Sequence, residues 1–156
     1  MSTGARSAGS AGGTQTHNHA HDETGRTPAQ WYCLLGGLAL LLAGIAGFLA
    51  ESSFDTGDQL ARGSLLGFDV NGWHNVVHLL SGAVLLAAAA KWRTAKTVAI
   101  AFGAVYGLVT IIGIIDGNDA LGLLPINTAD NILHIALSLL GIIAGVISRP
   151  KREDHR

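Results

Sequence analysis

VNGWHNVVHLLSGAVLL at residues 70–86 and INTADNILHIALSLLGII at residues 126–143 carry one polar pattern, Asn-x-x-x-Asn-x-x-His, twice and 56 residues apart. Its spacing places the three polar side chains of each copy on one stripe of an α-helix. Hydrocarbon has no water to satisfy them, so they must face protein, a ligand or a wet cavity. The repetition predicts an internal duplication around a shared polar centre. The six residues are Asn71, Asn75, His78, Asn127, Asn131 and His134.

The composition predicts a helical membrane protein. The chain of 156 residues is 49% hydrophobic and only 13% charged, which is a membrane composition. Four runs lack Asp, Glu, Lys and Arg, and each approaches the ~20 residues with which an α-helix crosses ~30 Å of hydrocarbon. We therefore predict an all-α membrane protein with four transmembrane helices, at about residues 31–50, 70–90, 97–115 and 131–148.

The basic residues predict the orientation of these helices. Nine of the ten Lys and Arg lie in the N-terminal tail, the second loop and the C-terminal tail, and only Arg62 lies in an odd-numbered loop. The positive-inside rule then places both termini in the cytoplasm. Membrane boundaries account for the basic residues, so the lipid bilayer is the expected partner and nucleic acid is not. The lone Cys33 excludes an internal disulfide.

The chain divides into a tail, a membrane domain and a second tail. Residues 1–28 are rich in Gly, Ser, Thr, Ala and His, which predicts a disordered cytoplasmic segment. Its His17, His19 and His21 could bind a metal weakly, although a solvated tail is the simpler interpretation. Residues 29–149 form the four-span domain, and 150–156 form a basic cytoplasmic tail. The repeat predicts a tandem duplication of a two-helix hairpin, with both polar stripes near the outer face.

The polar stripes have four interpretations. The favoured one is structural: Asn and His hydrogen-bond between helices and specify their pairing. A second is an outward-facing pocket for a small molecule or a lipid head group. A third is a membrane redox subunit with haem between His78 and His134, or a divalent metal. The fourth is proton or ion handling by histidine. The candidate metal ligands are His74, His78, Asp130 and His134.

No catalytic set accompanies the stripes. The chain has no Ser/His/Asp arrangement, phosphate loop or activated cysteine, so a non-enzymatic protein is the better expectation. No cofactor is predicted, and haem or a divalent metal stays open as the alternative. A homo-oligomer or a membrane partner subunit stays open as well.

Further motifs surround the two stripes. The motif residues are Leu66-Gly67-Phe68, Asn75, His78, Leu123-Leu124-Pro125, Asp130, Asn131 and His134. In this order, over roughly residues 31–148, the sequence resembles a family of small bacterial membrane proteins, the domain-of-unknown-function family numbered 4383, seen mainly in actinobacteria. The resemblance implies four spans and a bacterial inner membrane. It implies no activity, because the family has none assigned.

The topology can be tested with single cysteines in a Cys33→Ser background. We expect Ser53→Cys and Asn118→Cys to react with an impermeant thiol reagent in intact cells, because both positions lie in outer loops. Thr94→Cys, in the basic second loop, should react only after the cells are opened. Labelling of Thr94→Cys alone in intact cells would reverse the assigned orientation.

Overall fold

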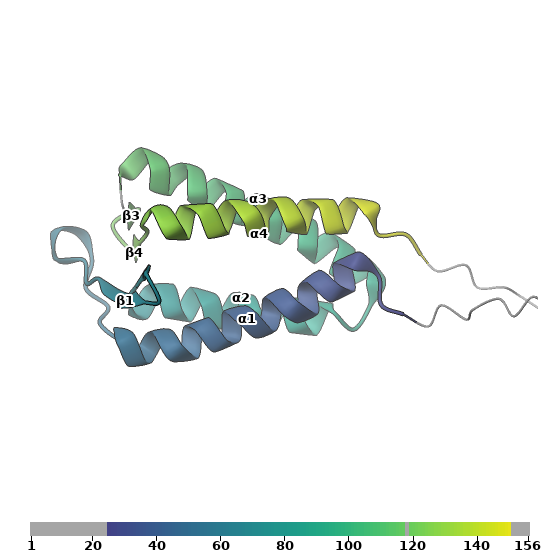
Figure 1. Ribbon diagram of the computed structural model, residues 1–156, viewed down its shortest axis with the longest axis horizontal. Helices are drawn as coiled ribbons and strands as arrows, with labels where there is room; N and C mark the ends of the chain where they lie inside the picture. Colours follow the sequence, from purple (N-terminus) through teal and green to yellow (C-terminus); the bar gives the residue numbers. More distant parts are fainter. Residues whose placement is uncertain (1–24, 118, 151–156) are drawn as a thin grey trace, which may run out of the picture.

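A computed structural model of the protein describes residues 25–117 and 119–150. Within these ranges it contains two antiparallel helical hairpins (Figure 1). The first hairpin joins α1 (Pro28–Ala50) to α2 (Gly72–Ala88), and the second joins α3 (Trp92–Asp116) to α4 (Thr128–Ile147). Most of the predicted disordered tail, residues 1–24, and most of the basic tail, residues 151–156, lie outside the described residues.

Three of the helices are long and apolar enough to cross a membrane. They are α1, α3 and α4, with 23, 25 and 20 residues. At ~1.5 Å per residue, the 17 residues of α2 reach only about 26 Å, short of the ~30 Å hydrocarbon core. The predicted second span was therefore too long at both ends. The third predicted span was too short, because α3 begins at Trp92 and includes Arg93 and Lys96 of the basic second loop.

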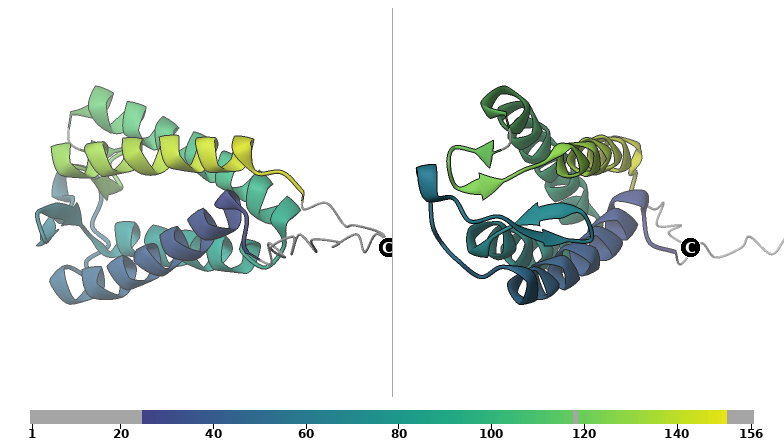
Figure 2. Two further views of the ribbon diagram at one scale, coloured as in Figure 1. Left: turned by 45° about the vertical axis from the view of Figure 1, so that its right-hand side comes forward. Right: turned by 60° about the vertical axis from the view of Figure 1, so that its left-hand side comes forward.

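Two small antiparallel ribbons lie in the loops that precede α2 and α4, which the all-α prediction did not include. The first joins β1 (Gly63–Leu65) to β2 (Phe68–Val70), and the second joins β3 (Asp119–Ala120) to β4 (Leu124–Pro125). Each ribbon reverses at a Leu-Gly pair in which both residues have positive φ: 54° and 92° at Leu66-Gly67, 59° and 65° at Leu121-Gly122. Positive φ at both central residues characterises the tight type I′ hairpin turn. Figure 2 shows both ribbons at the same end of the molecule.

The loop between α1 and α2 has local structure of its own. Residues 57–59 form a short 3-10 helix, and residues 63–70 fold back as the first ribbon. The amide N–H of Gly57 donates to the carbonyl of Gly122 at 2.8 Å. The loop between α1 and α2 is thus anchored to the loop between α3 and α4.

Small residues let the two helices of each hairpin approach closely. A Cβ atom on Gly37 of α1 would lie 2.9 Å from the carbonyl oxygen of Gly82 in α2. In the second hairpin, a Cβ atom on Gly103 would lie 2.6 Å from the carbonyl oxygen of Ser138. Gly103 of α3 thus takes the place of Gly37 of α1, 66 residues earlier. Ser138 of α4 takes the place of Gly82 of α2, 56 residues earlier. The two hairpins therefore use the same helix contact.

The hairpins meet at the end that carries the α2–α3 turn and separate towards the ribbons (Figure 1). The buried cluster at the meeting end includes Cys33, Leu85, Ala95 and Ala99. There the N–H of Ala29 donates to the Ser148 hydroxyl at 2.8 Å, which joins the start of α1 to the end of α4. Both ends of the described chain therefore lie on the same side as the basic turn.

Two neighbouring glycines test the close contact. Gly37→Ala should destabilise the protein, because overpacking against a backbone costs about 1–3 kcal/mol. Gly36→Ala is the matched control, because its Cβ atom would meet only the flexible Leu85 side chain, at 3.6 Å. The free energy of unfolding of the control should rise by ~0.5–1 kcal/mol, because Ala stabilises the middle of a helix by this amount relative to Gly. Equilibrium unfolding in mixed micelles measures both, and equal stability of the two variants would contradict this contact.

Candidate functional site

Asn71 and Asn127 form the N-caps of α2 and α4 and also tie each hairpin to the other. The side-chain oxygen of each accepts the N–H of the residue three positions later, at 2.8 Å for Asn71 and 3.0 Å for Asn127. The Asn71 amide then donates to the carbonyl of Leu123, and the Asn127 amide to the carbonyl of Gly67, both at 2.8 Å. These acceptors are also 56 positions apart. The two bonds are therefore reciprocal.

The residue three positions after each cap makes a second reciprocal pair. In α2, His74 Nδ1 lies 3.2 Å from the carbonyl oxygen of Pro125, to which it donates. In α4, Asp130 Oδ2 accepts the N–H of Asp69 at 2.9 Å. Proline has no N–H and offers only its carbonyl oxygen. The residue at position 74 therefore has to donate, whereas the equivalent Asp130 accepts. We call the four bonds made to the opposite hairpin by Asn71, His74, Asn127 and Asp130 the clasp.

The second Asn of each stripe points into its own hairpin. The Asn75 amide donates to the carbonyl of Glu51, at the end of α1, at 2.8 Å, and its side chain contacts Gly47. Asn131 lies beside α3, where a Cβ atom on Gly113 would be 3.1 Å from its Oδ1 atom. The six stripe residues therefore divide into caps, intra-hairpin contacts and histidines. They do not share a single centre.

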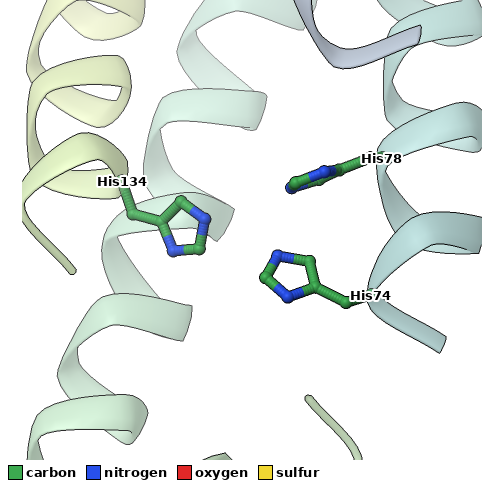
Figure 3. Close-up of side chains that lie close together, drawn as sticks. All are labelled: His74, His78 and His134. Atoms are coloured by element: carbon green, nitrogen blue, oxygen red, sulfur yellow. The ribbon is translucent and has the colours of Figure 1, made fainter. Parts of the chain in front are cut away.

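Three histidines from the two hairpins do converge. His74 and His78 of α2 and His134 of α4 each offer a ring nitrogen, and these atoms lie within 4.8 Å of one another. The His74 ring centroid is 4.4 Å from that of His78 and 6.1 Å from that of His134. Figure 3 shows the three rings around one small space. We call this group the histidine triad.

The triad is buried and its hydrogen bonding is incomplete. His74 is 2% and His134 is 4% exposed. Nδ1 of His78 and Nδ1 of His134 are buried without a hydrogen-bond partner in the described part of the chain. The Tyr106 ring packs edge-on against His134, at 5.1 Å between centroids. Buried polar atoms of native proteins nearly always have partners, so these nitrogens indicate a place for a water, an ion or a ligand.

A family model described as a domain of unknown function, DUF4383, matches residues 30–147. The chain belongs to the DUF4383 family. The resemblance read from the two stripes is thus confirmed. The matched region contains every residue of the clasp and of the triad, so both are features of the DUF4383 part of the chain. No curated protein and no solved structure matches the sequence.

A cavity of about 320 Å³ extends from the triad towards the outside of this DUF4383 bundle. It lies between α1 and α4, under the first ribbon, and ends at His78, Asp130 and His134. Its remaining walls are apolar. They are formed by Leu42, Ala43, Ala46, Leu65, Leu66, Phe68, Val70 and Leu133.

Imidazole nitrogens in this arrangement suit a divalent transition metal better than haem. Three histidines with an open fourth position are a known ligand set for catalytic Zn²⁺. In tetrahedral ligation with Zn–N distances of ~2.0–2.1 Å, the ligand nitrogens would lie about 3.4 Å from one another, so the three imidazoles would have to move closer together. Axial ligation of haem would need a flat slot between His78 and His134, and the His74 ring borders that space (Figure 3).

Asp130, the fourth candidate ligand, has a different position. It is not among the side chains that converge in the triad, although it borders the same cavity. Its Oδ2 atom accepts two backbone N–H groups, from Asp69 and from Asn127, each at 2.9 Å. The carboxylate therefore caps α4 and holds the first ribbon.

The backbone partners of the clasp could not be identified from the sequence. The oxygens of Gly67, Leu123 and Pro125 and the N–H of Asp69 carry no side-chain signal. One signal was available: a Leu-Gly pair precedes each stripe, at residues 66–67 and 121–122. Because this pair occurs before both stripes, it would have indicated that the internal duplication includes the loops before α2 and α4.

The clasp can be tested by replacing each capping amide with a carboxylate. Asn71→Asp and Asn127→Asp keep a good N-cap oxygen but lose the donor to the opposite hairpin. We expect each to lower the free energy of unfolding by about 0.5–1.5 kcal/mol, because each loses one hydrogen bond to the opposite hairpin, whose acceptor carbonyl belongs to an exposed residue, Leu123 or Gly67. Asn127→Asp should cost more, because Asn127 also donates to the Asp69 carboxylate at 3.0 Å.

Gln59→Glu makes the same chemical change at an exposed position in the loop between α1 and α2 and serves as the control. It should leave stability within about 0.5 kcal/mol of the parent. If both clasp variants matched this control in equilibrium unfolding, the inter-hairpin bonds would contribute nothing.

Proposed function

We propose that this DUF4383 protein is a multi-pass protein of the bacterial plasma membrane that binds one divalent transition-metal ion near the outer face. His74, His78 and His134 would be the ligands. The observation that carries the proposal is the convergence of three buried imidazoles, two of which retain an unpartnered Nδ1 atom. The redox role considered from the sequence is not part of it, because nothing in the geometry requires electron transfer.

Four membrane crossings are supported by the positions of the chain ends. Ala29 and Ser148 are hydrogen-bonded, so α1 begins and α4 ends on one side. A chain that starts and finishes on the same side crosses an even number of times. The three long helices alone would give an odd number, so the proposal includes α2 as a fourth crossing. Lys96 lies at this same end, where its Nζ atom donates to the carbonyl of Ser148 at 3.2 Å, and a basic end is cytoplasmic by the positive-inside rule.

The duplication is supported by pairs of contacts that recur at fixed spacing. The clasp bonds of α2 and α4 match at an offset of 56 residues, and the glycine contacts of α1 and α3 match at an offset of 66. An internal two-fold axis along the membrane normal would produce this correspondence. It would also bring His78 and His134, which occupy equivalent positions, to opposite sides of one site.

The hydrogen bonds around the triad favour a metal over a purely structural role. His74 donates Nδ1–H to a carbonyl, which leaves the lone pair of neutral imidazole on Nε2. Metal-ligating histidines almost always hold their other nitrogen in this way. Structural pairing explains the clasp residues, since each has a partner. It does not explain why His78 and His134 approach one another with nitrogens unused.

Metal binding can be measured on the full chain after the tail histidines are replaced. In a His17→Asn, His19→Asn, His21→Asn and His155→Asn background, we expect one Zn²⁺ or Co²⁺ per chain, with the visible absorption of tetrahedral Co²⁺. His78→Leu or His134→Leu should weaken binding by more than about 100-fold, beyond the 10–100-fold typical of outer partners. Acidification should release the ion, because imidazole binds metal only when neutral.

Asn131→Leu is the matched control for His134→Leu. It removes a half-buried polar side chain one turn away on α4, but not a triad residue. It should therefore leave the bound cobalt and its spectrum unchanged. Absence of a stoichiometric ion from the parent protein, or retention of the ion in both histidine variants, would show that the triad is not a metal site.

A further inference from the structure

The cavity that ends at the triad opens towards lipid. Its wall on α1 is formed by Leu42, Ala43 and Ala46, which belong to a helix able to cross the membrane. Leu42 is 67% and Leu66 is 92% exposed at this cavity. Large apolar side chains exposed on a transmembrane helix face hydrocarbon, so a molecule entering between α1 and α4 would come from the bilayer.

The cavity lining combines apolar and polar side chains. Leucine, alanine, valine and phenylalanine side chains form most of it, and His78, His134 and Asp130 supply the polar part. His134 and Asp130 are buried, whereas Leu42 and Leu66 are exposed, so polar groups lie at the deep end and apolar ones at the mouth. A ligand that matches both parts has an alkyl chain and one compact polar head. The volume of about 320 Å³ lies at the lower end of ligand cavities, which are ~300–1,000 Å³. This size fits one chain better than two.

The charge at the inner end selects the head group. Three neutral imidazoles and a divalent ion carry a charge of +2, and the Asp130 carboxylate reduces it to +1. An anion therefore complements the site, whereas a cationic head would be repelled. Oxygen is also an accepted fourth ligand of Zn²⁺ beside three histidines. A carboxylate satisfies both conditions with a single compact group.

From these features we infer that the cavity binds a single-chain carboxylate amphiphile, of the fatty-acid class. It would enter from the lipid between α1 and α4, and its carboxylate oxygen would occupy the open position of the ion held by the triad. This inference rests on the proposed metal site and names the ligand of that site.

The cobalt form of the protein reports directly on this ligand. In the tail-substituted background and in uncharged maltoside micelles, we expect sodium dodecanoate to shift the visible bands of bound Co²⁺. Acetate should require at least about tenfold higher concentration, because it has no chain to bury in the cavity. Dodecanol has the chain without the anion and should leave the bands unchanged. Equal potency of acetate and dodecanoate would overturn the inference, as would absence of any shift with dodecanoate.

A variant in the cavity wall separates binding in the cavity from partition into the micelle. Ala43→Phe should fill the cavity and raise the dodecanoate concentration required by at least about tenfold, through steric overlap. Ile45→Phe is the control, because Ile45 lies on the same turn of α1, is 58% exposed and does not line the cavity. It should behave as the parent does. Ala46→Val provides a milder obstruction if Ala43→Phe does not fold.

The cobalt spectrum before dodecanoate is added distinguishes the two possible failures. If no cobalt is bound, the proposed metal site fails and this inference fails with it. If cobalt binds and is lost in His134→Leu, the metal site stands. In that case, equal responses of Ala43→Phe, Ala46→Val and Ile45→Phe to dodecanoate would overturn the amphiphile alone.

Discussion

The hydrogen bonds between the first turns of α2 and α4 and the backbone of the opposite hairpin fix the end of this molecule that carries the ribbons. Four side chains supply them, and each bond has a counterpart 56 positions along the chain. One of the four, His74, is also a member of the triad. The distance between the triad nitrogens therefore depends on the same bonds that hold the ribbons together. A change that loosened the clasp would widen the space between His78 and His134 without touching either residue.

Packing at the other end sets the shape of the cavity. Glycines bring the two helices of each hairpin into backbone contact, and small side chains such as Ala95 and Ala99 let the hairpins meet near the α2–α3 turn. From there the hairpins separate until the ribbons bridge them (Figure 1). The cavity lies between these two ends, on the side of the bundle formed by α1 and α4. Apolar side chains form most of its wall.

The sequence predicted the helices and the histidines better than the loops. Helical periodicity placed His78 and His134 on the two polar stripes, and His74 was a further candidate metal ligand; all three converge. The ribbons were missed because Leu66 and Leu121 adopt positive φ, which is rare for a residue without a special propensity for it. The common role expected for the Asn residues was also too simple. Whether Asn75 reaches the end of α1 or the other hairpin depends on helix rotation, which periodicity does not specify.

Pro125 makes the hydrogen bonds between the two hairpins asymmetric. In this chain its carbonyl meets a histidine donor, while the free N–H of Asp69 meets the Asp130 carboxylate. A second hairpin facing a copy of itself would set each Asp130 against a proline that has no hydrogen to give. Each carboxylate would then keep the bond from the N–H of Asn127 in its own hairpin but lose the one from the opposite hairpin, at an energetic cost. The halves are therefore not interchangeable, and a symmetric dimer of the second half alone would lack this bond at both of its Asp130 residues.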